Sequence, residues 1–212
     1  MTKLPPKLLS CRYLPNADAR LCESLGLKNK NNRSLAFVTC DQDDTLYAAL
    51  DHATKMSPVE VIFAKSFYAG SAHASGPLSG EVIGVLSGAD PDVVEQGVAA
   101  LKLALNELFA FYAIGGVNVF PTVIASVGEY LAEQGGVTPG VPFGYFIAPP
   151  LEAMLGVDAA LKAADVRLLK LFSPPTETNF AGCYVTGTLD AVQAAAAAFT
   201  AAIEDIVARP IL

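Results

Sequence analysis

The chain has 212 residues, of which 52% are apolar and 17% are charged, and its net charge at neutral pH is −7. This length is enough for one or two globular domains, and the apolar content excludes a disordered chain. The 14 basic residues are scattered and outnumbered by 21 acidic ones, which argues against a nucleic-acid-binding protein.

Hydrophobic periodicity divides the first half of the chain into seven elements in the order β α β α β β α. Asp90 is the expected N-cap of the last helix, and Pro91 falls in its first turn. The predicted strands cover residues 8–14, 34–40, 59–67 and 81–88, and the predicted helices cover 17–27, 45–56 and 91–108.

An uncharged stretch from residue 108 to residue 128 has about the length of a membrane-spanning helix. Gly115, Gly116 and Pro121 interrupt it, so we expect a helix end, a turn and a strand, and no membrane partner. The four cysteines lack CxxC or CxxxH spacing, and we expect reduced thiols in the core of a cytosolic protein.

The second half of the chain returns to the same order of elements. Its predicted strands cover residues 122–127, 143–148, 166–172 and 180–187, and its predicted helices cover 129–134, 151–164 and 190–207. The fold class is therefore α/β, of the α+β, ferredoxin-like kind, with one unit of roughly half the chain present twice.

A short motif supports this duplication. The segment DHATK, at 51–55, recurs as DAALK, at 158–162, and both segments continue to a strand that begins with Val. A glycine ends the last strand of each copy, at Gly88 and Gly187. The two glycines are closer together in the chain than the two motifs, because the first copy has a longer loop near 68–80. We predict two domains, residues 1–113 and 114–212.

The repeated motif places an acid four residues before a lysine on each helix. Asp51 with Lys55, and Asp158 with Lys162, are then ion pairs in the favourable orientation, worth a few tenths of a kcal/mol each. The alanines beside Lys162 would let another backbone approach closely. A solvated helix face is the ordinary interpretation of one such motif, but its recurrence favours contacts with a neighbouring chain.

At these residues the sequence resembles a known family, the tandem-domain shell proteins of bacterial microcompartments for ethanolamine utilisation. The segments that carry the resemblance are DQDDTLYAALDHATK, EVIFAKSFYAGSAH, GEVIGVLSG, APPLEAMLGVDAALKAADV and PPTETNFAG, which span the chain from about residue 34 to 207. The resemblance implies a tandem repeat of two circularly permuted shell domains, with the final edge strand of each moved to its front.

It also implies a homotrimer whose six domains form a flat pseudohexagonal tile in the shell of a cytoplasmic microcompartment, beside other shell proteins. Lys55 and Lys162 become candidates for contacts at the tile edge. A gated central pore on the threefold axis would pass metabolites or cofactors, and the chain itself would need no cofactor and would not be an enzyme.

The resemblance assigns residues to the pore loops and to a small-pore site for a metabolite such as ethanolamine. The loop near 68–80 is rich in Gly, Ala and Ser, which suits a moving gate, although composition alone favours a surface hairpin loop. The pore-loop candidates are Tyr68, Ala69, Gly70, Ser71, His73, Pro175, Thr176, Glu177 and Asn179. The ligand candidates are Asp43, Asp44, Glu81, Glu152 and Thr178.

Asp43 and Asp44 also lie where a strand gives way to a helix, so their carboxylates could cap the helix and attract a small ammonium compound. The chain has ASVGEYL, with Ser126 and Val127, where the family pattern is SRTGSYL. The identity of the ligand is therefore left open by the residues.

Other classes of function find less support. His52 and His73 lack partners at metal-ligand spacing, so no metal site is predicted. Ser66 or Ser71 beside His73 would need a GxSxG elbow to suggest a nucleophile, and none is present. The alternative is a discrete tandem ferredoxin-like regulatory protein that binds a small metabolite.

Overall fold

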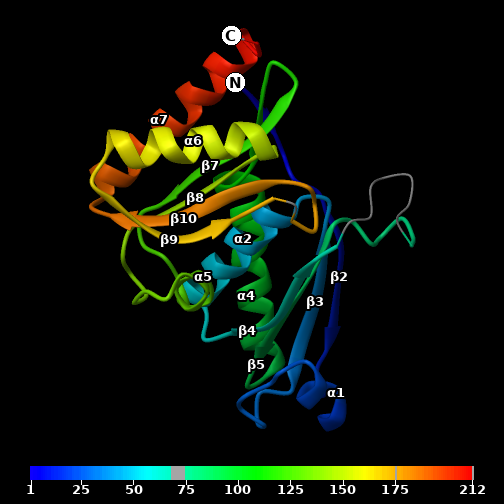
Figure 1. Ribbon diagram of the computed structural model, residues 1–212. Coiled ribbons are helices and arrows are strands. Elements are labelled where there is room, and N and C mark those ends of the chain that lie inside the picture. The colour runs from blue at the N-terminus through cyan, green and yellow to red at the C-terminus, as the bar shows by residue number, and fades with distance from the viewer. Residues whose placement is uncertain (68–74, 175, 212) are drawn as a thin grey trace. The chain divides into compact units, whose positions relative to one another are not determined.

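The structure is a computed structural model that describes residues 1–67, 75–174 and 176–211 (Figure 1). The chain forms two compact units. Unit 1 contains Met1–Leu4, Ala110–Val127 and Ala132–Leu212, and unit 2 contains Pro5–Phe109 and Gly128–Leu131. The predicted domain boundary between residues 113 and 114 stays a prediction.

Unit 2 is built on a four-stranded antiparallel sheet in the order β2-β3-β5-β4. Its strands are β2 (Leu8–Leu14), β3 (Ser34–Cys40), β4 (Glu60–Ser66) and β5 (Val82–Gly88). Its helices are α1 (Ala19–Ser24), α2 (Asp43–Met56), α4 (Pro91–Leu103) and a π-helical turn η1 (Ala104–Leu108). Each of these elements was predicted, although α2 begins two residues earlier than expected and the last helix changes to the π form after Leu103.

The helices of unit 2 follow from helical spacing of small and apolar residues. On α2, Leu46, Ala49, Leu50 and Ala53 are fully buried, as the 3.6-residue period requires for a helix that packs on a sheet. Asp90 caps α4 as predicted, because its side chain accepts a hydrogen bond of 2.9 Å from the Val93 N–H.

Unit 1 contains a six-stranded sheet in the order β1-β6-β7-β8-β10-β9. Its strands are β1 (Thr2–Leu4), β6 (Phe111–Ile114), β7 (Val117–Ile124), β8 (Phe143–Ala148), β9 (Val166–Phe172) and β10 (Ala181–Gly187). Its helices are α6 (Pro150–Ala163) and α7 (Leu189–Ala208), with the end of α5 (Glu129–Gly135), whose first three residues belong to unit 2. Figure 1 shows α6 and α7 side by side on one face of the sheet, over a core that includes Phe146 and Phe199.

Helix α7 is the one helix of the described residues that is long and apolar enough to cross a membrane by length and composition. Its buried residues Val192, Ala195, Ala196, Phe199 and Ile203 recur at helical spacing and belong to the core of unit 1. The uncharged stretch at 108–128 contains the end of η1, strand β6, a turn and strand β7. The predicted helix end, turn and strand are therefore present, and β6 is an additional strand. All four cysteines are free thiols, and three of them are buried.

The two copies agree in detail. Helices α2 and α6 both have 14 residues, and their first residues, Asp43 and Pro150, differ in number by the same offset as the two motif lysines. Strand β4 has a one-residue bulge at Ile62 in its pairing with β5, and β9 has one at Leu169 in its pairing with β10. The two bulged residues are separated by the same number of positions as Lys55 and Lys162. Such bulges bend an edge strand and hinder pairing with a foreign strand. The duplication predicted from the motif is therefore confirmed by strand order, helix length and bulge position.

Candidate functional site

An acidic cluster, which we define as Asp41, Asp43, Asp44 and Glu81, lies in unit 2 around the start of α2. Asp43 and Asp44 occupy the first turn of the helix, and each is only 6% exposed. Carboxylates at this position are favoured by the helix dipole. The N-cap residue is Gln42, and its side chain makes no capping hydrogen bond. Asp43 and Asp44 were predicted to cap the helix, but they lie inside its first turn, where the Asp43 carboxylate accepts the Asp44 N–H.

Asp43 is held by two hydrogen bonds of ordinary length. One carboxylate oxygen accepts from the Asp44 N–H at 2.9 Å, and the other accepts from the Ser66 hydroxyl at 2.8 Å. The Tyr47 hydroxyl lies 2.5 Å from Ser66 Oγ. Because Ser66 gives its one proton to Asp43, Tyr47 is the donor in that bond. The chain of three groups fixes the orientation of the Asp43 carboxylate.

The cluster concentrates negative charge. Burial raises the pKa of Glu81 to about 6, and the charges of Asp43 and Asp41 act in the same direction. Burial also raises the pKa of Tyr47, and the charges of Asp43 and Asp44 add to this shift. A small cation at this place would be attracted by every member of the cluster. Within the three described ranges, no group of three or more His, Cys, Asp or Glu residues could hold a metal ion.

The remaining ligand candidates, Glu152 and Thr178, belong to unit 1. Glu152 lies in the first turn of α6, and Thr178 lies in the turn before β10. The structure therefore brings Asp43, Asp44 and Glu81 together in unit 2, and it assigns the other two candidates to a different unit. Their part in a common site stays a prediction.

The predicted pore-loop residues are only partly described. Tyr68, Ala69, Gly70, Ser71, His73 and Pro175 lie outside the described residues. Thr176 closes a tight turn, since its hydroxyl donates to the Phe180 carbonyl at 2.8 Å and accepts from the Phe180 N–H at 3.1 Å. Asn179 in this turn has φ 62°, in the left-handed region that Asn tolerates better than most residues. Glu177 is exposed.

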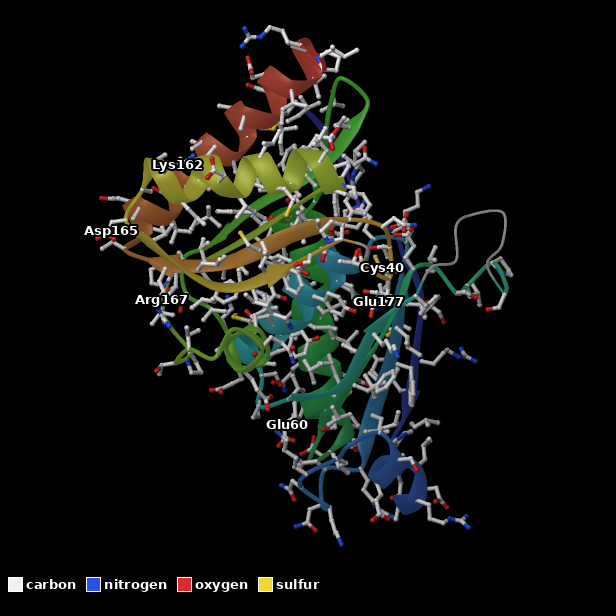
Figure 2. All side chains as sticks on the ribbon, viewed as in Figure 1. Cys40, Glu60, Lys162, Asp165, Arg167 and Glu177 are labelled. Atoms are coloured by element: carbon white, nitrogen blue, oxygen red, sulfur yellow. The ribbon has the colours of Figure 1, made fainter. Side chains whose placement is uncertain are left out.

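The two predicted edge lysines lie near the ends of equivalent helices. Lys162 is 74% exposed and its ammonium lies 2.6 Å from the Asp158 carboxylate, as predicted for the second motif. Figure 2 shows Lys162, Asp165 and Arg167 at the same end of unit 1, where α6 leads into β9. Lys55 is also exposed, but partial burial lowers its pKa while the charge of Asp51 opposes the shift.

Asp51 differs from its counterpart Asp158 in a way that no sequence pattern indicated. Its side chain is fully buried and accepts hydrogen bonds from the Gly128 N–H at 2.7 Å and the Leu131 N–H at 2.9 Å. Burial raises the pKa of Asp51, whereas the two N–H donors and the charge of Lys55 lower it. The predicted ion pair of the second motif is therefore confirmed with both groups exposed. In the first motif the charges of Asp51 and Lys55 also interact, but the Asp51 carboxylate is buried and bonds backbone N–H groups, which the sequence did not indicate.

A second side chain of α2 joins this contact. The Thr54 hydroxyl donates to the Asp51 carbonyl at 2.7 Å and accepts from the Glu129 N–H at 3.1 Å. Asp51 and Thr54 together therefore bond the N–H groups of Gly128, Glu129 and Leu131 around the start of α5. Their side chains act there as N-cap side chains do in other helices, although they come from a distant part of the sequence.

Comparison with known proteins matches the chain along nearly all of its length. No family model matches it. It is 42% identical over 209 residues to the bacterial microcompartment shell protein EutL of Salmonella typhimurium, with 97% of this chain and 95% of the relative covered. It is 39% identical to EutL of Clostridium perfringens, with 97% and 96% covered. The crystal structure of ethanolamine utilization protein EutL from Leptotrichia buccalis has a TM-score of 0.95 and 42% identity, with all of both chains covered.

Proposed function

The chain belongs to the EutL family of bacterial microcompartment shell proteins, and we propose that it is a structural tile of that shell: a homotrimer in which three chains present six copies of one unit. The family places the chain in the shell of an ethanolamine-utilisation compartment inside the bacterial cytoplasm. Its fold is accordingly a tandem repeat of two circularly permuted shell domains.

The observation that carries the proposal is the duplication together with the full-length match. Two copies with the same element order, equal helices α2 and α6 and equivalent bulges give one chain two similar units. A chain of this kind can build a closed ring of six similar units from three copies. The family assignment favours this role over a discrete regulatory protein, and a wall component performs no covalent chemistry.

Lateral contacts between tiles are proposed for Lys55 and Lys162. Both lie in the last turn of a helix and are exposed. The long side chain of Lys162 stands beside Ala163 and Ala164, which offer little steric hindrance to the backbone or carboxylates of an adjacent tile. Other shell proteins of the compartment are the expected neighbours.

A gated central pore is proposed for the loops near 68–80 and 175–179. Support comes from the described base of the first loop, where Gly80 has φ 63° and the Thr39 hydroxyl donates to the Leu78 carbonyl at 2.7 Å. An added Cβ on Gly80 would lie 2.0 Å from the Cys40 carbonyl oxygen, so this end of the loop is fixed by close packing. A ligand shifts such a gate only as far as it prefers one state.

A small primary ammonium compound such as ethanolamine is proposed as the ligand of the acidic cluster. Asp43, Asp44 and Glu81 supply the charge, and the Tyr47–Ser66–Asp43 hydrogen bonds hold one carboxylate in place. Glu152 and Thr178 are further contacts proposed on the resemblance. An ammonium ion held by a few carboxylates near water binds weakly, which suits the sensing of an abundant metabolite.

Electron microscopy of the purified chain at high concentration tests the tile. Particles with a hexagonal outline, or flat sheets of them, are the expected result. Isolated particles without threefold symmetry would contradict the proposal and would favour the metabolite-binding regulator.

A further inference from the structure

Equivalent faces of α2 and α6 differ sharply in burial. The face of α2 is formed by Asp44, Ala48 and Asp51, which are 6%, 0% and 0% exposed. The equivalent face of α6, at the offset that relates the two copies, is formed by Leu151, Leu155 and Asp158. These two leucines are 60% and 48% exposed, and the Asp158 side chain is 58% exposed. Leu151 and Leu155 are one turn apart and form a contiguous exposed apolar surface, the kind of feature that marks an interaction site when it is part of a larger patch.

At Asp51, this face of α2 is covered by Gly128–Leu131, which belongs to unit 2. Asp51 bonds the Gly128 and Leu131 N–H groups, and the rings of Tyr47 and Tyr130 lie with centroids 6.2 Å apart. Leu131 is fully buried. If the repeat holds, the segment that covers α6 is the one in the first copy that corresponds to Gly128–Leu131.

Hydrogen bonds around α1 and α5 identify that counterpart. In the first copy, the Leu27 N–H bonds the Cys22 carbonyl and the Gly26 N–H bonds the Glu23 carbonyl. In the second copy, the same two bonds run from Val137 to Ala132 and from Gly136 to Glu133. Gly26 and Gly136 both have positive φ. This correspondence aligns Gly128–Leu131 with residues 18–21.

This first-copy segment is exposed where its counterpart is buried. The Arg20 side chain is 91% exposed, and Leu21 is 40% exposed, whereas Leu131 is fully buried. Each chain therefore has an exposed helix face on α6 and, at residues 18–21, an exposed segment of the kind that covers the equivalent face of α2.

We propose that residues 18–21 of one copy cover the α6 face of the next copy in a head-to-tail contact. Leu21 packs on Leu151 and Leu155 of the next copy, and the Arg20 guanidinium pairs with its Asp158. The inference rests on the proposed trimer and specifies which surfaces join its chains. Because the two surfaces differ, the contact is heterologous and closes into a ring when the rotation permits.

One departure from the repeat shapes this contact. Asp18 stands where Gly128 stands, and it already caps α1 by accepting from the Arg20 N–H at 2.9 Å. In the proposed contact, Asp158 therefore pairs with the Arg20 side chain, whereas its counterpart Asp51 bonds backbone N–H groups. The Arg20 guanidinium holds Asp18 at 3.0 and 3.1 Å, and its five N–H donors leave enough for Asp158 of the next copy.

Disulfide cross-linking tests the contact. In a Cys11→Ser background, the pair Leu21→Cys and Leu155→Cys is expected to form disulfides between chains, giving a covalent ladder that ends at three chains on non-reducing gels. The matched control pairs Leu21→Cys with Leu189→Cys, an exposed leucine on α7. Equal cross-linking in the control, or by Leu21→Cys alone, would overturn the proposal.

A charge exchange gives an independent test. Arg20→Glu and Asp158→Arg are each expected to raise the dissociation constant of the assembly at least tenfold, and the double variant is expected to restore it to within about threefold. The same exchange at the exposed pair Asp205 and Arg209 on α7 is the control. A trimer insensitive to all these changes would refute this contact while leaving the proposed function intact, whereas a monomeric wild-type protein would refute both.

Discussion

The Asp51 carboxylate and the Gly128 N–H are joined by a hydrogen bond of 2.7 Å, although 77 residues separate them in the chain. The same carboxylate bonds the Leu131 N–H, so one side chain of the first copy satisfies the start of a helix from the second half of the sequence. The repeated DxAxK motif therefore has two uses: a buried cap at Asp51 and an exposed ion pair at Asp158.

Replacing Asp51 by Asn should destabilise unit 2. An amide offers one acceptor oxygen, so the Gly128 or Leu131 N–H would face an NH₂ group and lose its partner, at a cost of about 1–3 kcal/mol. Denaturant unfolding measures the loss, and hydrogen exchange at both amides locates it. Asp205→Asn, at an exposed pair on α7, should change stability by less than about 0.5 kcal/mol. Unchanged exchange protection at Gly128 and Leu131 would contradict the cap.

Replacing Gly128 by Ala should disturb the same contact sterically. An added Cβ would lie 2.4 Å from the Asp51 carbonyl oxygen and 2.6 Å from Thr54 Oγ1, so the segment must move away. We expect a loss of about 1–3 kcal/mol in the free energy of unfolding. Gly76→Ala is the control, because its Cβ would find its nearest neighbour at 3.9 Å. Equal stability of the two variants would show that the close approach is not needed.

The raised pKa of Glu81 predicts a pH-dependent stability. Its pKa is about 6 in the folded protein and 4.5 ordinarily, so the folded state binds the proton more tightly than the unfolded state. This contribution is fully present below pH 4.5 and is lost as the pH rises through 6. Because Glu81 is only half buried, solvent screening limits it to about 1 kcal/mol.

Carbon-detected NMR titration of the Glu81 carboxyl measures this pKa directly, and Glu81→Gln should remove the corresponding slope of stability with pH. A titration midpoint at or below 4.5 would contradict the account of the acidic cluster. Asp43→Asn should lower the Glu81 midpoint, because it removes a neighbouring negative charge.

Ethanolamine binding should depend on the acidic cluster. Isothermal titration calorimetry at a pH above 7 should give weak binding to the wild type, and the dissociation constant should rise at least threefold in Asp43→Asn or Glu81→Gln. Glu204→Gln, on the exposed side of α7, is the control for net charge. Affinity should also fall as Glu81 is protonated near pH 6. Identical affinities in all variants would place the ligand elsewhere.

Lys162→Ala should weaken the packing of tiles without dissociating them. The change removes the exposed ammonium near the end of α6 while leaving the buried face of that helix intact. Microscopy should show fewer or smaller sheets, and light scattering should show an unchanged assembly mass. Lys102→Ala, at an exposed lysine of α4, should leave the sheets as they are. Sheets that form equally in both variants would remove Lys162 from the tile edge.

The regular elements were predictable because apolar runs and caps are local signals. Strands β2, β3, β8 and β9 were predicted to the residue, and Asp90 was recognised as an N-cap. Strands β1 and β6 were missed. They are very short, and they pair with each other although one lies at the start of the chain and the other near its middle, so no local pattern marks them.

The candidate site was predictable only in part. Asp43, Asp44 and Glu81 were grouped through the family resemblance, and the structure places them in one unit. The roles of Tyr47 and Ser66 in orienting Asp43 were not foreseen, because they depend on how β4 lies beside α2. The burial of Asp51 was not foreseen, because its helix spacing equals that of Asp158 and only the long-range approach of Gly128 distinguishes them.

In the proposed assembly, two copies of one unit allow three chains to act as six. Light scattering coupled to size-exclusion chromatography measures it most directly, as the absolute mass of the purified protein in solution. The proposed trimer requires a mass three times that of the 22.1 kDa chain, independent of concentration over the micromolar range. A mass of one chain over that range would contradict it.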